Sequence, residues 1–109
     1  MELAFGSKLL RTTCESETHA RDELGTVVTE LLKHRLSDLR AATTVTDLLV
    51  GNPRLLGDAE NKHMIINLGE SHRLVICANH PKNPIDKDGK IDWPKVTRIQ
   101  IVGIEKYHG

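Results

Sequence analysis

The sequence predicts an α+β domain, with N-terminal helices packed on one face of a mainly antiparallel sheet of four or so strands. Three observations predict this class. Apolar residues recur at helical spacing before residue 42, two short apolar runs follow at 64–68 and 74–78, and a β-branched run closes the chain at 96–106. Because the helical and strand patterns occupy separate parts of the chain, the helices should lie together on one side of the sheet. A chain of 109 residues is expected to form one domain, 1–109.

The first quarter of the chain carries one strand signal and two helix-start signals. Glu2–Phe5 is a short apolar segment ended by Gly6, which is typical of an edge strand. Ser7 is placed to cap a helix over Lys8–Cys14, and Ser16 is placed to cap a second helix to about Leu24.

The strongest periodicity in the chain follows these two short helices. It predicts one helix from about Thr26 to Ala42, with Gly25 as the joint to the preceding helix. The apolar residues recur at steps of three and four and should form one core-facing stripe: Leu24, Val27, Val28, Leu31, Leu32, Leu36 and Leu39.

The second half of the chain is typical of strands and loops. Thr44-x-x-Asp47 has the form of a capping box and predicts a short turn to Leu49, before a loop at 50–53. The runs 64–68 and 74–78 predict a hairpin whose turn covers 69–73. Residues 80–90 are polar and should form an exposed loop, and the last strand should carry a bulge or bend near Gly103.

Composition excludes several classes of function. Phe5, Trp93 and Tyr107 are the only aromatic residues, so the core must be aliphatic and a base-stacking platform is not expected. Cys14 and Cys77 lie far apart in sequence and are interpreted as reduced thiols, and no metal site is expected. No signal peptide or membrane-spanning run is present, which favours a cytoplasmic protein without a membrane partner.

The net charge is zero but unevenly distributed. Residues 1–60 hold 7 Lys and Arg against 10 Asp and Glu, and residues 61–109 hold 8 against 5. If the protein has an anion-binding surface, that surface is therefore expected on the second half of the chain.

An ordered set of short motifs resembles one known family. The matching segments are 35–42, 46–49, 55–58, the hairpin strands 65–68 and 72–76, 89–93, and 96–109, which ends in Tyr107-His108-Gly109. Together they resemble the toxins of the RelE/ParE superfamily, and within it the HigB-like branch of plasmid-maintenance killer proteins.

This resemblance implies a RelE-like fold and a toxin of a type II toxin–antitoxin system. Such a toxin would be a ribosome-dependent endonuclease that cleaves messenger RNA without metal or other cofactor. Its implied partners are the ribosome, messenger RNA and a cognate antitoxin, expected to be a small helix-turn-helix protein. Related gyrase poisons share the fold without nuclease activity, so a non-catalytic binding module is the alternative.

The resemblance also implies roles for individual residues. Tyr107 and His108 match the C-terminal Tyr-His of the family, where an acid or base is expected, and Arg73 matches a phosphate-stabilising basic residue. Arginine suits that role because its guanidinium can grip a phosphate with two donors. Further candidates for RNA or phosphate binding are Lys62, His63 and Arg98.

Each candidate also has a purely structural interpretation. Arg73 could pair with Glu70 or Glu105, Tyr107 could cap the core with its hydroxyl in water, and His63 could be a surface histidine. Two features favour the non-catalytic alternative. Lys106 stands where an acidic residue commonly precedes the Tyr-His of the family, and a neutral chain forfeits much of the general attraction to RNA phosphates.

Overall fold

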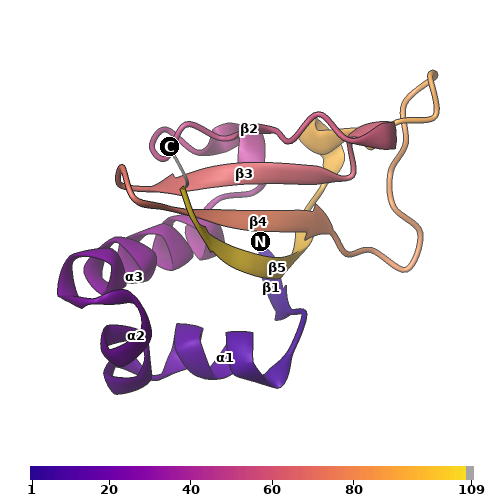
Figure 1. Cartoon of the computed structure of the whole chain (residues 1–109). Coiled ribbons are helices and arrows are strands. Elements are labelled where there is room, and N and C mark those ends of the chain that lie inside the picture. Colours follow the sequence, from indigo (N-terminus) through magenta and orange to yellow (C-terminus); the bar gives the residue numbers. More distant parts are fainter. Residues whose placement is uncertain (108–109) are drawn as a thin grey trace.

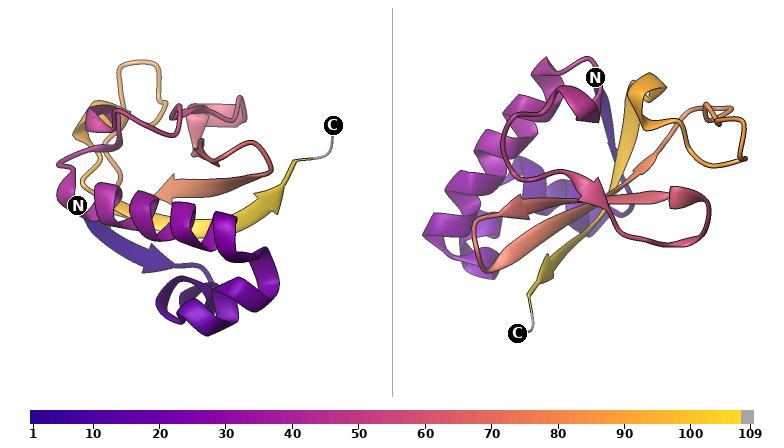
Figure 2. Two further views of the ribbon diagram at one scale, coloured as in Figure 1. Left: turned by 90° about the vertical axis from the view of Figure 1, so that its left-hand side faces the viewer. Right: turned by 90° about the horizontal axis from the view of Figure 1, so that it is seen from above.

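The computed structural model describes residues 1–107, which form two layers. Helices α1, α2 and α3 lie together on one side of a β-sheet, as Figure 1 and the two further views in Figure 2 show. This arrangement confirms the predicted α+β class.

Within residues 1–107 the sheet has five strands in the order β1-β5-β4-β3-β2. All neighbouring pairs are antiparallel except β1 and β5, which run parallel. The strands are β1 (Glu2–Phe5), β2 (Arg54–Leu55), β3 (His63–Leu68), β4 (His72–Ala78) and β5 (Arg98–Lys106). Glu2–Phe5 is thus an edge strand, as the sequence predicts, while the two-residue β2 follows the predicted loop at 50–53, in a segment where no strand is predicted.

The three helices begin where the sequence places their caps. Ser7 accepts a hydrogen bond from Leu10 N at the start of α1 (Lys8–Glu15), and Ser16 accepts one from His19 N at the start of α2 (Glu17–Leu24). Helix α3 (Thr26–Ala41) follows Gly25, whose φ of 82° makes the joint. At its other end, the Met1 amino group donates to three carbonyl oxygens, those of Leu39, Arg40 and Ala42.

The core lies between α3 and the sheet. Helix α3 contributes Val28, Leu32, Leu36 and Leu39, and the strands contribute an aliphatic layer that includes Ile66, Leu68, Leu74, Ile76, Ile99 and Ile101. The prediction of a core-facing stripe is wrong for one residue, Val27, which is 74% exposed. A stripe built on steps of three and four spans more of the helix circumference than the sheet covers, so its outer margin lies in water.

The last strand, β5, begins two residues later than predicted, and it carries the predicted bulge near Gly103. Val75 pairs with Gly103 and Ile76 with Ile101, so Val102 is the extra residue of a bulge. The strand begins at Arg98 because residues Trp93–Lys95 form a 3-10 turn, η3, with Pro94 inside it.

The connections follow the sequence signals with small shifts. The Thr44–Asp47 capping box is present and opens a 3-10 turn, η1 (Val45–Asp47), which ends before the predicted Leu49. Residues 80–90 form a loop. Its first residue, His80, is attached to the start of β5, because its Nε2 accepts hydrogen bonds from the backbone N–H groups of Thr97 and Arg98. A 3-10 turn, η2 (Ala59–Asn61), precedes β3. Its last residue, Asn61, accepts a hydrogen bond at its carbonyl oxygen from the Trp93 indole N–H, at 2.8 Å.

Candidate functional site

A polar row crosses the end of the sheet on the face opposite the helices. Asn67 on β3 pairs with Arg73 on β4, and Arg73 pairs with Glu105 on β5. Because side chains alternate along a strand, these three residues point away from the aliphatic layer that α3 covers. The tight β3–β4 turn places the row at the hairpin end.

Tyr107 closes over this row from the end of β5. Its backbone N–H donates to Ser71 O at 2.8 Å, and its ring lies 5.4 Å from the guanidinium carbon of Arg73. The hydroxyl donates to Asn67 Oδ1 at 2.5 Å and accepts from Arg54 Nη2 at 2.6 Å. Tyr107 is therefore bound to the β3–β4 turn through its main chain, to β4 through its ring face, and to β2 and β3 through its hydroxyl.

Arg54 and Asn67 belong to this cluster although sequence reasoning does not single them out. Arg54 also donates from Nη1 to Asn67 Oδ1 at 3.0 Å and to Asn52 O at 3.1 Å. Alternation along β3 was the one available signal for Asn67, since it is the polar residue of an apolar strand. Arg54 has no such signal, because no strand is predicted over residues 54–55 and the register of β2 with β3 is a tertiary property.

Arg73 forms an ion pair with one of the two carboxylates that the sequence offers it. Its Nε and Nη2 both donate to Glu105 Oε2, at 3.0 and 2.8 Å, and the Arg73 and Glu105 side chains are 26% and 50% exposed. A hollow of about 540 Å³ opens beside the pair, lined by Arg73, Glu105, Lys106 and Tyr107. The Arg54–Asn67–Arg73–Glu105–Tyr107 set is called the arginine–tyrosine cluster below.

His63 lies on the same face but at the other end of the hairpin. It pairs with Cys77, and the buried Ile65 and Val75 separate its row from that of Arg73. Asn67 is four residue steps along β3 from His63, a separation of about 13 Å. Its Nδ1 is 2.7 Å from Asp58 Oδ2, a contact that lowers the pKa of Asp58.

The remaining sequence candidates do not join the cluster. Lys62 lies beside His63 and pairs with Glu60 at 3.5 Å. Arg98 begins β5 and pairs with Glu2 at 3.2 Å, whereas Glu105 lies near the end of the same strand. His108 lies outside the described residues. The structure thus brings Arg73 and Tyr107 together and places Lys62, His63 and Arg98 elsewhere.

Two groups on β4 have pKa values shifted from their ordinary ranges. Burial, with a smaller contribution from the Lys106 ammonium, lowers the pKa of His72. Burial also raises the pKa of the Cys77 thiol, so Cys77 is not an activated nucleophile. No three His, Cys, Asp or Glu side chains within residues 1–107 gather in a way that could hold a metal ion.

The chemistry available at the cluster is anion binding next to a fixed phenol. Two guanidinium groups, on Arg54 and Arg73, approach Tyr107 from different strands, and guanidinium groups bind phosphate oxygens with paired donors. The hydroxyl of Tyr107 is the proton-bearing group held between Arg54 and Asn67.

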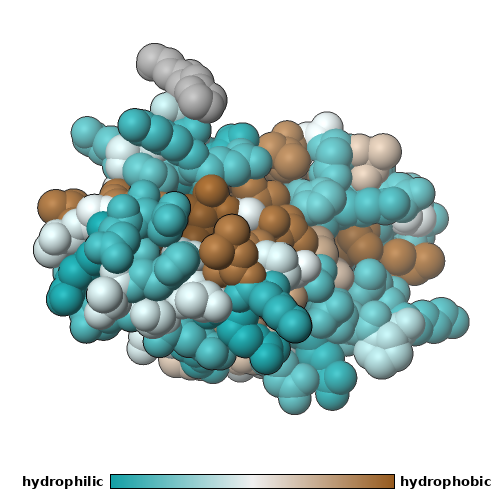
Figure 3. Space-filling view, turned by 60° about the horizontal axis from the view of Figure 1, so that its bottom comes forward, coloured by the Kyte–Doolittle hydropathy of each residue, from teal (hydrophilic) through white to brown (hydrophobic). Residues whose placement is uncertain are grey.

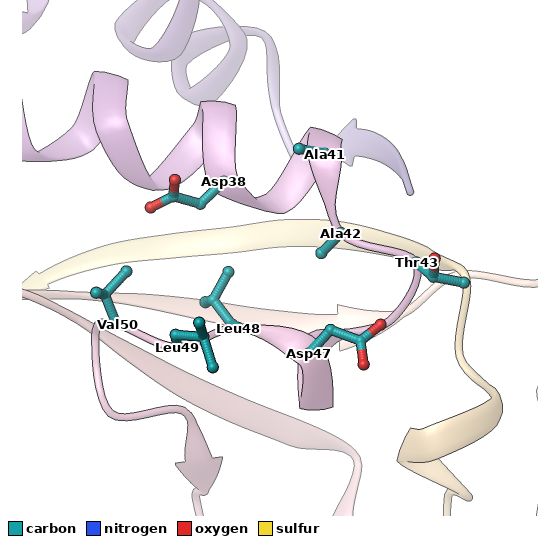
Figure 4. A pocket seen from close by; sticks show the side chains of 8 residues that line it. All are labelled: Asp38, Ala41, Ala42, Thr43, Asp47, Leu48, Leu49 and Val50. Carbon is teal, nitrogen blue, oxygen red and sulfur yellow. The ribbon is translucent and has the colours of Figure 1, made fainter.

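Two apolar hollows lie away from the cluster. One, about 540 Å³ in volume, lies between the end of α3 and the segment after η1, where Leu48, Leu49 and Val50 face Asp38 and Ala42 (Figure 4). The other is lined by Leu9, Leu10, Leu24 and Ile104 from α1, α2 and β5. Apolar side chains also gather in the middle of the face shown in Figure 3, with hydrophilic ones around them.

Comparison with known proteins identifies the fold. No family model matches the sequence, and no curated protein matches it. The whole chain matches 98% of a chain in the solved YoeB–YefM complex from Staphylococcus aureus, with a TM-score of 0.59 and 13% sequence identity. At this identity the likeness concerns the fold, and it confirms the predicted RelE-like arrangement. No helix within residues 1–107 is long and apolar enough to span a membrane.

Proposed function

We propose that this protein is the toxin of a type II toxin–antitoxin system, of the HigB-like branch, and that it cleaves ribosome-bound messenger RNA in the cytoplasm. The observation that carries the proposal is the convergence of Arg54 and Arg73 on Tyr107, on the face of the sheet that the helices leave uncovered. The C-terminal Tyr-His motif and the fold shared with a chain of the YoeB–YefM complex support it.

RNA cleavage without metal needs a base for the 2′-hydroxyl, an acid for the leaving 5′-oxygen and cations for the phosphate. In our proposal Arg73 and Arg54 neutralise the phosphate, and Tyr107 positions the substrate or shares in the proton transfer. His108 is the acid or base, since imidazole is the side chain best matched to neutral pH. Attack of the 2′-oxygen on phosphorus would break the bond to the 5′-oxygen, which takes the proton.

The proposed regulatory partner is a cognate antitoxin encoded alongside the toxin, with a helix-turn-helix fold. The support for a protein partner is that the matching chain was solved within a YoeB–YefM complex. A small helix-turn-helix protein encoded next to this chain, able to restore growth when both are produced, would be the expected finding.

The activity can be tested by adding the purified protein to translating ribosomes and mapping the ends of messenger RNA by primer extension. We expect new ends with the unchanged protein, and a loss of at least tenfold in cleavage for Arg73→Ala, because about 1.4 kcal/mol of lost transition-state stabilisation gives that factor. Arg21→Ala is the matched control, since Arg21 pairs with Glu17 on α2, on the helical side of the molecule.

Intact messenger RNA, together with unaffected growth when the protein is produced in cells, would contradict the nuclease proposal. Cleavage by all three proteins to the same extent would instead show that the nuclease site lies away from Arg73.

A non-catalytic binding module is the second candidate function. The neutral net charge, Lys106 next to Tyr107 and the pairing of Arg73 with Glu105 favour it. Replacing Tyr107 and His108 together by Ala separates the two functions. A folded double variant that still arrests growth acts by binding, and loss of the arrest supports catalysis.

A further inference from the structure

Glu105 occupies the edge of the Arg73 guanidinium that is best suited to a phosphate. Arg73 has five N–H donors, and those of the Nε–Nη2 edge form a fork that matches two oxygens of a phosphate group. In this structure both atoms of that edge donate to a single oxygen, Glu105 Oε2, at 3.0 and 2.8 Å. Register holds the two residues together, because Arg73 and Glu105 are direct partners across β4 and β5.

The Nη1 group on the other side of the Arg73 guanidinium is not held by Glu105. Among residues 1–107, Nη1 has no hydrogen-bond partner, and the guanidinium carbon lies 5.4 Å from the ring centre of Tyr107. A phosphate that approached Nη1 would leave the Glu105 pair intact but would meet a cation already neutralised. A phosphate that used the Nε–Nη2 edge would have to displace the carboxylate. Glu105 opposes phosphate binding by either route.

We infer that Glu105 sets the affinity of the Arg73 site, acting as an internal carboxylate that a phosphodiester of single-stranded RNA must outcompete. The inference rests on the proposed function for its choice of ligand and assigns a role to a residue that the resemblance leaves without one. Three cations, Arg54, Arg73 and Lys106, lie around Tyr107, and Glu105 is paired with one of them, Arg73.

The opposite role for Glu105 would be to orient Arg73 for the ligand. The two roles predict effects of opposite sign, and Glu105→Gln distinguishes them. Glutamine keeps an acceptor oxygen for the guanidinium, so the orientation of Arg73 survives, while the competing negative charge is removed. If Glu105 competes, RNA binds more tightly to the variant. If it only orients, affinity is unchanged or falls.

The test is fluorescence anisotropy with a short labelled oligouridylate, at near-physiological salt, for the unchanged protein and for Glu105→Gln. We expect a gain in affinity of roughly two- to fivefold, the factor that corresponds to the strength of a partly exposed ion pair. Glu70→Gln is the matched control, because Glu70 lies exposed in the adjacent β3–β4 turn and makes no ion pair within residues 1–107. It removes the same charge near the same site and should give a clearly smaller gain.

A double-variant cycle identifies the partner. The gain from Glu105→Gln should vanish in the Arg73→Ala background, since the carboxylate acts through that guanidinium. Equal gains for Glu105→Gln and Glu70→Gln, no gain for either, or weaker binding by Glu105→Gln would each overturn the inference.

This result is separable from the proposed function. Tighter RNA binding by Glu105→Gln with intact messenger RNA on ribosomes would retain the inference and remove the nuclease. Cleavage of messenger RNA with no change in RNA affinity for Glu105→Gln would retain the nuclease and remove the inference.

Discussion

Tyr107 shows how much a single residue at the end of a strand can be constrained by residues distant in sequence. Its hydroxyl contacts Arg54 and Asn67, its ring contacts Arg73 and its N–H contacts Ser71. A purely structural tyrosine with its hydroxyl in water was one interpretation of the sequence. The structure instead gives the hydroxyl two protein partners, so its position is fixed before any ligand arrives.

His72 provides a prediction at the residue scale. Its direct partner across β4 and β5 is Lys106, and its Nδ1 lies 2.7 Å from Ser71 Oγ. Burial is the larger and the Lys106 ammonium the smaller cause that keeps the pKa of His72 below its ordinary value of 6.5. We expect the pKa of His72, measured by NMR titration, to lie below that value and to rise part of the way towards it in Lys106→Gln.

The sign for stability follows from the same shift. Since the folded protein favours neutral imidazole, the contribution of His72 to stability is present above pH 6.5 and is lost as the pH falls through the lower folded pKa. Lys95→Gln is the control for the NMR titration and should leave the pKa of His72 unchanged. The Lys95 side chain is 75% exposed and pairs with Asp92 near η3. A His72 pKa at or above 6.5 in the unchanged protein would contradict the prediction.

At the scale of elements, the loop that leads into β2 holds the cluster from outside the sheet. Gly51 O accepts from Asn67 N at 2.7 Å, and Arg54 follows three residues later. Gly51 has a φ of +82°, and a Cβ there would lie 2.7 Å from Ile66 Cγ2 and 3.1 Å from Arg35 Nε. The loop therefore passes so close to the core that a side chain at residue 51 has no room.

This close approach can be tested with a pair of glycine substitutions. Gly57 has a similar φ of +90° but open space around its Cα, so Gly57→Ala should cost only the backbone strain, about 1 kcal/mol. We expect Gly51→Ala to lose a further ~1–3 kcal/mol of unfolding free energy through overpacking. Equal losses for the two variants in denaturant unfolding would show that the loop moves aside freely.

At the scale of the whole molecule, the two layers leave the sheet with one face covered by helices and one face that carries the arginine–tyrosine cluster. The helices bury Ile66, Leu74 and Ile101 on one side. The arginine–tyrosine cluster lies at the hairpin end of the other side, so the site depends on strand register more than on helix packing. Deep core substitutions should consequently weaken folding without altering the chemistry of the cluster in the molecules that remain folded.

The layer packing predicts contrasting effects along α3. Leu32 is 1% exposed, and Leu32→Ala should lower the unfolding free energy by roughly 2–5 kcal/mol, because it leaves a cavity between the layers. Val27 on the same helix is 74% exposed, and Val27→Ala should stay within about 0.5 kcal/mol of the unchanged protein. Comparable losses in the two variants would mean that the stripe faces the sheet over a wider arc.

Local patterns predicted most of the elements but less of the site. Ser7, Ser16 and Gly25 act through contacts within a few residues, so the helix boundaries could be read directly. Strand pairing within one hairpin is similarly local, and the structure pairs His63 with Cys77 at the end of the hairpin away from Arg73.

The sequence by itself determined the α+β class, the bulge near Gly103 and the candidacy of Arg73 and Tyr107. Only the tertiary structure decided that Arg54 and Asn67 meet the Tyr107 hydroxyl, that Glu105 rather than Glu70 neutralises Arg73, and that Arg98 pairs with Glu2. The physical reason is that caps, turns and apolar periodicity act over short sequence distances. The cluster depends instead on the pairing of β2 with β3 and of β4 with β5, which joins residues far apart in sequence.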